Sequence, residues 1–231
     1  MSNFNRYNGQ SAQTVAYTDH SAWGRISTHK VLRNTYMLLA MTLFFSGAMA
    51  ALSVSLQIKG LGGIITLIAS MALLFVTMKL RNSVWGLVSI FAFTGFMGMS
   101  LGPMLSRYLA LPGGSSIVMT AMLMTGFIFA GLSAYVLISK RDFSFMGGFL
   151  FAGMIVAVLA SLGAFFFEIA ALSLAVSAVM VLLMSGMILY ETSNIIHGGE
   201  TNYIMATIDL YLSIFNLFTS LLHLLGFIEK D

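Results

Sequence analysis

The last long apolar segment, residues 202–227, carries a line of polar side chains through an otherwise apolar stretch. These side chains follow one another at steps of four, three, four and three residues: Asp209, Ser213, Asn216, Ser220 and His223. At 3.6 residues per turn, such steps place all five on one face of a helix. Because polar atoms in lipid would lack hydrogen-bond partners, we expect this polar stripe to face other helices or a water-filled crevice.

A second acid, Glu191, stands before this segment in a stretch, residues 190–202, that has no Lys or Arg. If the sixth and seventh apolar segments are antiparallel neighbours, Glu191 and Asp209 approach each other. Two carboxylates close together in a low dielectric cannot both ionise cheaply, so they would share a proton, bind a cation or recruit a basic partner. Lys79 and Arg81 are the candidates for that basic partner.

A purely structural role for the same residues stays open as the alternative. Asp209 would then be a neutral, hydrogen-bonded acid that holds two helices together. Ser213 and Asn216 could equally be packing contacts, since Ser and Asn often bridge membrane helices.

The composition indicates which elements position these residues. The chain has 231 residues, of which 58% are hydrophobic and 8% charged, against about 25% charged in soluble domains. This predicts an all-α integral membrane protein, because a helix of ~20 apolar residues crosses the ~30 Å hydrocarbon core. Seven segments are long enough: about 34–56, 61–78, 84–102, 117–138, 145–166, 171–190 and 202–227.

These spans use almost the whole of residues 29–231, which we therefore expect to form a single seven-helix transmembrane domain. Residues 1–28 are rich in Asn, Ser, Gln and Thr, which predicts a disordered cytosolic tail. Between the third and fourth spans, residues 103–116 hold both prolines and predict a loop. The pairs Gly47–Ala51 and Gly98–Gly102 have the spacing of close helix contacts.

The positions of the basic residues predict the orientation of the chain. With a cytosolic N-terminus, eight Lys and Arg residues fall inside and three fall outside: Arg6, Arg25, Lys30, Arg33, Lys79, Arg81, Lys140 and Arg141 against Lys59, Arg107 and Lys230. This positive-inside pattern puts the C-terminus across the membrane. The net charge of +3 is therefore a topology signal and predicts no nucleic-acid partner.

Catalytic motifs are missing from the chain. It has no cysteine, which excludes thiol catalysis and cysteine metal sites. It also has no HExxH motif of a zinc protease. We therefore expect no enzyme and no resident cofactor.

Four strings point to a known family. HKVLRNTY (29–36), FAFTGFMG (91–98), ETSNIIHGGETNY (191–203) and the run that follows them to the C-terminus resemble the Bax inhibitor family of membrane proteins. The first three are similar to its bacterial branch that modulates the FtsH protease. The resemblance covers the chain from His29 to Asp231.

The resemblance implies a seven-helix protein of the bacterial inner membrane, with the last helix at the centre of a bundle of the other six. It implies a protein that binds and restrains the membrane-anchored, ATP-dependent protease FtsH. The alternative that it implies is a pH-sensitive calcium leak controlled by two acids. The first acid falls on Glu191 and the second position is occupied by Ser213, so Asp209, ~6 Å earlier along the helix, would have to substitute as proton or calcium ligand.

Overall fold

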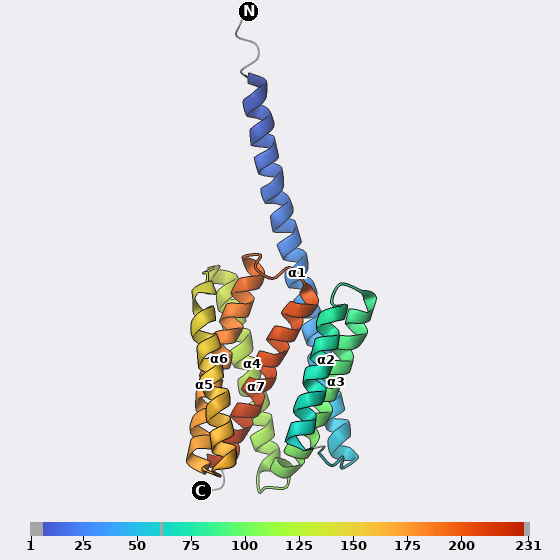
Figure 1. The fold of residues 1–231 in the computed structure, drawn as a ribbon, viewed down its shortest axis with the longest axis vertical. Helices are drawn as coiled ribbons and strands as arrows, with labels where there is room; N and C mark the ends of the chain where they lie inside the picture. The colour runs from blue at the N-terminus through green and yellow to red at the C-terminus, as the bar shows by residue number, and fades with distance from the viewer. Residues whose placement is uncertain (1–6, 61, 229–231) are drawn as a thin grey trace, which may run out of the picture.

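The computed structural model describes residues 7–60 and 62–228, with side chains at 29–60 and 62–227. The helices are α1 (Tyr7–Ser55), α2 (Gly63–Leu80), α3 (Val84–Leu109), α4 (Gly114–Ser139), α5 (Gly147–Phe166), α6 (Ala170–Ile196) and α7 (Tyr203–Ile228), with a 3-10 turn at Ser144–Met146 (Figure 1). Within this described part, seven helices are long and apolar enough to cross a membrane and there is no strand. The predicted all-α, seven-span fold is confirmed.

Two predictions about domain organisation stay predictions. One is the disordered tail expected at residues 1–28. Residues 1–6 lie outside the described residues, and the side chains of residues 7–28 are not described either. The assignment of 29–231 to one domain is likewise untested at its C-terminal residues, 229–231.

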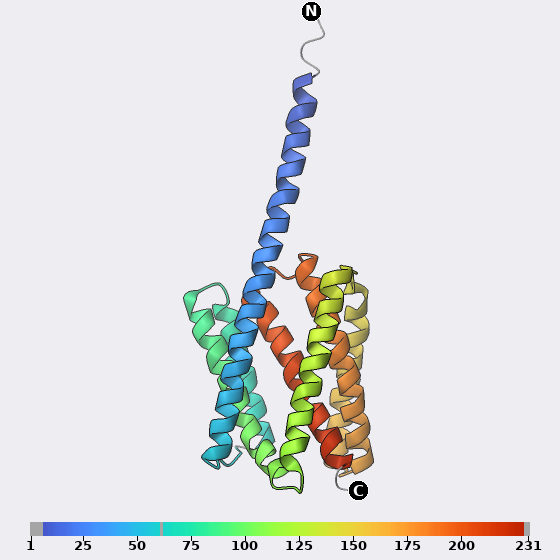
Figure 2. The same ribbon diagram turned by 180° about the vertical axis from the view of Figure 1, so that it is seen from behind.

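Helix α7 lies at the centre of the bundle, as expected. It packs against α1, α3, α4 and α6, whereas α2 packs on α3 and α5 on α6 at the outside (Figure 1). Seen from behind, α1 and α4 stand in front and α7 is visible between them (Figure 2). The apolar side chains of α7 agree with this central position, because four of them are almost fully buried: Leu210, Tyr211, Leu217 and Leu222.

The bundle has two ends, which we name by their connections. The α6–α7 end also holds the α2–α3 and α4–α5 turns and the point where α1 extends away from the bundle (Figure 1). The α1–α2 end holds the α3–α4 and α5–α6 turns and lies beside the C-terminus. Every connection between neighbouring helices is short, so consecutive helices run antiparallel.

Helix α3 continues through Pro103 to Leu109 and α4 begins at Gly114, so the predicted loop at 103–116 is wrong except at residues 110–113. Proline has no N–H, which leaves the carbonyl of Met99, four residues earlier, without its helical partner. The Ser53 hydroxyl of α1 donates to that carbonyl at 2.9 Å. A hydroxyl of a neighbouring helix thus replaces the lost bond, which is how membrane helices tolerate proline.

The two small-residue pairs differ in what they contact. A Cβ at Gly98 would collide with the Ser46 carbonyl of α1, and one at Gly102 with the Ser53 side chain, so this pair lets α1 and α3 pack closely. A Cβ at Gly47 would have no heavy atom within 4 Å. The expected helix contact at Gly47 is therefore wrong, and this glycine faces open space.

Candidate functional site

Glu191 lies inside helix α6 and not in the connection that follows it. The sequence predicted the sixth span to end at 190, but α6 continues to Ile196 and ends where Gly198 takes a φ of 79°. The amide of His197 donates to the Ser193 carbonyl at 3.0 Å and that of Gly199 to the Asn194 carbonyl at 2.9 Å, which satisfies the last turn. The Glu191 side chain is consequently buried in the bundle, with 7% of its surface exposed.

Ser213 of α7 is the direct partner of this acid. Its hydroxyl donates a hydrogen bond to Glu191 Oε1 at 2.9 Å, and Ser213 is itself buried. The other carboxyl oxygen, Oε2, is buried and has no hydrogen-bond partner among the described residues. The position at which the family resemblance leads one to expect a second acid is thus a hydroxyl that contacts the first acid.

Asp209 lies one turn before Ser213, nearer the α6–α7 end, and is half-buried. Among the described residues, no hydrogen bond joins Asp209 to Glu191. Glu200 lies in the α6–α7 connection, where its Oε1 accepts a hydrogen bond from the Asn202 amide at 2.6 Å. The hydrogen bond to Glu191 comes from Ser213, and the expected proximity of Glu191 and Asp209 stays a prediction.

The two predicted basic partners are not brought to the acids. Lys79 Nζ lies 5.2 Å above the centre of the Phe75 ring, on the outer helix α2. Arg81 contributes its backbone carbonyl, which accepts a hydrogen bond from Asn202 Nδ2 at 3.3 Å. The contacts of both residues are therefore with other groups, and their pairing with Glu191 or Asp209 stays a prediction.

The rest of the polar stripe follows the seam between α6 and α7. His223 Nδ1 and the Ser177 hydroxyl of α6 are 2.8 Å apart, and Ser220 is buried. Asn216 Nδ2 donates to the Leu212 carbonyl of its own helix at 2.9 Å. The stripe thus faces protein and not lipid. Apart from the Ser213–Glu191 bond, its hydrogen bonds join α7 to α6 or lie within α7.

A hydroxyl cluster beside Glu191 was not anticipated. Tyr36 of α1 donates to Ser133 of α4 at 3.0 Å, and Thr192 of α6 lies 3.4 Å from both hydroxyl oxygens. The three residues are isolated hydroxyls in three different spans, so no spacing in the sequence links them. The only sequence signal is that Thr192 directly follows the acid.

The α4–α5 turn is fastened to α6 about half a turn beyond Glu191. The Phe143 amide donates to the Ser193 hydroxyl at 2.9 Å, and the Ser144 amide donates to Asp142 Oδ1 at 2.8 Å. The Ser144 hydrogen bonds, with help from His197 and Ser193, hold the pKa of Asp142 below its usual range. These hydrogen bonds hold the α4–α5 turn against α6.

Chemically, the site offers one buried carboxyl whose second oxygen is unpaired. Such an oxygen is where a proton, a cation or a water molecule can add, because buried polar atoms are rarely left unsatisfied. Among the described residues, no three His, Cys, Asp or Glu side chains gather in a way that could hold a metal ion. Any ion at Glu191 would be held by carboxyl, hydroxyl and water oxygens, the ligands that calcium accepts.

The chain is similar in sequence to one protein family and to several bacterial proteins. The family described as "Inhibitor of apoptosis-promoting Bax1" matches residues 28–230. The modulator of FtsH protease YccA of Escherichia coli K12 is 48% identical over 94% of this chain and 99% of its own length. An uncharacterized protein of Pseudomonas aeruginosa is 55% identical over 87% and 90% of the two chains, and an uncharacterized membrane protein of Vibrio cholerae is 47% identical over 94% and 99%.

The family match covers all seven spans, the Glu191–Ser213 pair and the polar stripe. Relatives near half identity extend over almost the same residues. This chain, a multi-pass membrane protein, belongs to the Bax inhibitor family.

Proposed function

We propose that the protein binds and restrains an FtsH-type membrane-anchored, ATP-dependent protease in a bacterial inner membrane. The observation that carries the proposal is the 48% identity with the E. coli modulator of FtsH protease, over 94% of this chain. A relative from a second E. coli strain with the same identity is named an inner membrane protein.

The arrangement of charges supports a definite orientation for this function. The α6–α7 end carries Lys30, Arg33, Lys140 and Arg141, whereas Lys59 and Arg107 stand at the α1–α2 end. By the positive-inside rule, the α6–α7 end and the N-terminus face the cytosol. The acids of the site therefore stand near the cytosolic surface.

The outer helices provide lateral surface for a partner within the bilayer. Helices α2 and α5 each pack on a single neighbouring helix. Their large apolar side chains are exposed, among them Ile64 and Phe75 of α2 and Phe149 and Phe165 of α5. A membrane-anchored protease can contact such faces without displacing any part of the bundle.

Co-isolation tests the binding part of this proposal. Tagged protein, expressed in E. coli that lacks its own modulator, is purified from mild-detergent extracts, and FtsH is quantified in the eluate. We expect FtsH to be retained at the level found with the E. coli modulator, and a seven-helix protein of another family to retain none. Retention by the E. coli modulator but not by this chain would contradict the proposal.

A second candidate function, a proton-sensitive cation leak, is favoured by one observation. Glu191 Oε2 is buried without a partner among the described residues, and Ser213 donates to the other oxygen of the same carboxyl. Protonation changes the charge at the centre of the α6–α7 seam, where a small helix shift would open a path. Calcium is the ion that the oxygen ligands suit.

Flux measurements in proteoliposomes test the leak. We expect calcium entry to depend on pH, and Glu191→Gln and Asp209→Asn to flatten that dependence because each removes a titrating group. Ser213→Asp, which adds an acid against Glu191, should steepen it. Wild-type flux equal to that of protein-free liposomes at every pH would rule this function out, with no bearing on protease binding.

A further inference from the structure

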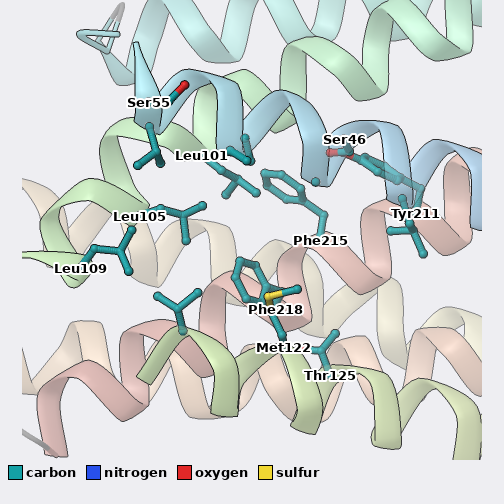
Figure 3. Close-up of a pocket in the computed structure, with 16 residues that line it drawn as sticks. Ser46, Ser55, Leu101, Leu105, Leu109, Met122, Thr125, Tyr211, Phe215 and Phe218 are labelled. Carbon is teal, nitrogen blue, oxygen red and sulfur yellow. The ribbon is translucent and has the colours of Figure 1, made fainter. Parts of the chain in front are cut away.

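A lateral crevice lies in the half of the bundle towards the α1–α2 end. It has a volume of about 610 Å³ and is walled by α1, α3 and α4, with α7 as its floor. Phe215 and Phe218 of α7 point into it, and Leu105 and Met122 line its opposite sides (Figure 3). Gly47 forms part of the α1 wall, which explains why nothing contacts this glycine.

The lining of the crevice suits hydrocarbon and not a polar ligand. Its hydroxyl groups already have partners within the protein. The Ser46 and Tyr211 hydroxyls are 2.7 Å apart, the Thr125 hydroxyl donates to the Ala121 carbonyl at 2.7 Å, and the Ser55 hydroxyl donates to the Leu52 carbonyl at 2.9 Å. A polar molecule would lose its own hydrogen bonds here without replacement, whereas an alkyl chain would lose none.

The depth of the crevice matches one leaflet of a bilayer. Along α1 its lining runs from Leu43 to Ser55, which is roughly 18 Å at 1.5 Å per residue. This is a little more than half of the ~30 Å hydrocarbon core. An acyl chain that enters from the α1–α2 end would therefore stop near the middle of the membrane, where the crevice ends at Tyr211.

A helix of a partner protein fits the crevice poorly. With side chains a helix is about 10 Å across, so each 5.4 Å turn occupies roughly 400 Å³. The volume of about 610 Å³ would hold fewer than two turns. A lipid acyl chain is narrower and flexible, so it can fill the crevice over its full depth.

The mouth of the crevice carries a positive charge. A second cavity, of about 510 Å³, shares Val54 and Leu109 with the crevice and is lined by Gln57 and Lys59 at the α1–α2 end. Lys59 is exposed there, at the level where phospholipid headgroups stand. A lysine ammonium beside an apolar slot complements a phosphate ester that carries an acyl chain.

We propose that the crevice between α1, α3 and α4 is a phospholipid site, which takes one acyl chain over Gly47 and holds the lipid phosphate at Lys59. The site is distinct from the Glu191–Ser213 pair, because Ser213 contacts α6, whereas the α7 residues that line the crevice face α1, α3 and α4. A bound lipid would fill the gap between α1 and α4, so that its acyl chain contacts both helices.

Photo-crosslinking tests this site in the full-length protein. The probe is phosphatidylglycerol with a diazirine on its acyl chain, added at low mole fraction to nanodiscs that contain the protein. We expect labelled peptides from residues 43–55 of α1 and 118–125 of α4. Gly47→Leu fills the slot and should lower this labelling roughly tenfold, the effect of removing about two methylene groups from an apolar site.

Gly131→Leu is the matched control, because Gly131 of α4 also has open space around it and does not line the crevice. It should leave the labelling unchanged. Lys59→Gln should reduce the labelling by phosphatidylglycerol more than that by an uncharged diacylglycerol probe. Equal labelling of wild type and Gly47→Leu, or labelling spread evenly over α2 and α5, would overturn the proposal.

A protein occupant is distinguished by a reciprocal experiment. Benzoylphenylalanine is placed at position 51, beside the crevice, and irradiated in intact membranes. Adducts with the mass of a phospholipid support the site, and adducts with a second protein in place of lipid would overturn it.

Discussion

At the scale of the residue, the unusual feature is an acid–hydroxyl pair at the centre of a membrane bundle. Ser213 satisfies one oxygen of Glu191 and leaves the other without a partner. A second carboxylate at position 213 would stand within hydrogen-bonding distance of the first, and the two could not both be charged cheaply. With serine there, the acid of α7 is Asp209, which lies one turn before Ser213.

Replacement of Ser213 tests the energetic importance of the pair. Ser213→Ala removes the hydrogen bond to Oε1 and should destabilise the protein by about 1 kcal/mol. In a Glu191→Leu variant, Ser213→Ala should lower stability much less, because the alanine and leucine side chains are both apolar and leave no buried carboxyl oxygen unpaired. Thermal unfolding in one detergent measures both, and an equal loss in the two backgrounds would mean that Ser213 does not act through Glu191.

The turn at Asp142 gives a pH-dependent prediction. Because the pKa of Asp142 is lower in the folded protein than in the unfolded chain, its carboxylate stabilises the fold above the usual aspartate range, about 3.9. This contribution is lost as the pH falls through the lowered folded value. Asp142→Asn should therefore lower the unfolding temperature at pH 7, and the difference from wild type should shrink towards pH 3.

An unfolding-temperature difference that stays constant from pH 7 to pH 3 would contradict this account. The matched control is Ser139→Ala, since Ser139 lies in the same exposed turn and accepts only a long hydrogen bond, at 3.4 Å, from the Arg141 amide. It should show no dependence on pH.

At the scale of the element, α3 depends on α1 for its integrity. Ser53 supplies the hydrogen bond that Pro103 removes, and Gly98 and Gly102 let the two helices approach closely enough for it. The proline is thus accommodated by a contact between helices and not within α3 itself.

Removal of the Ser53 hydroxyl tests this dependence. Ser53→Ala leaves the Met99 carbonyl unpaired in a buried position and should lower stability by about 1–3 kcal/mol. Ser70→Ala is the matched control, because that exposed hydroxyl bonds only to the Leu67 carbonyl of its own helix. Both are compared by thermal unfolding, and an equal effect of the two changes would show that α3 tolerates Pro103 unaided.

Hydropathy predicted the seven spans and the periodicity of α7 predicted the polar face, because both depend on local composition. The ends of α3 and α6 were wrong for reasons that lie outside those helices. A hydroxyl of α1 rescues Pro103, and Glu191 becomes buried because Ser213 meets it from α7. The cluster of Tyr36, Ser133 and Thr192 was missed because only tertiary packing brings the three helices together.

At the scale of the whole molecule, two distinct features stand on different faces of one central helix. Towards α6, α7 contributes Ser213, which donates a hydrogen bond to Glu191. Towards α1, α3 and α4, it forms the floor of an apolar crevice. The outer helices α2 and α5 leave lateral faces on which a membrane partner can sit without disturbing either feature.

The central claim, restraint of an FtsH-type protease, is tested most directly by proteolysis in proteoliposomes. FtsH and a membrane-protein substrate are reconstituted with increasing amounts of this protein, and substrate loss is followed in the presence of ATP. We expect degradation to slow in proportion to the protein added and a seven-helix protein of another family to have no such effect. A degradation rate that stays unchanged at every ratio, under conditions where the E. coli modulator slows it, would contradict the claim.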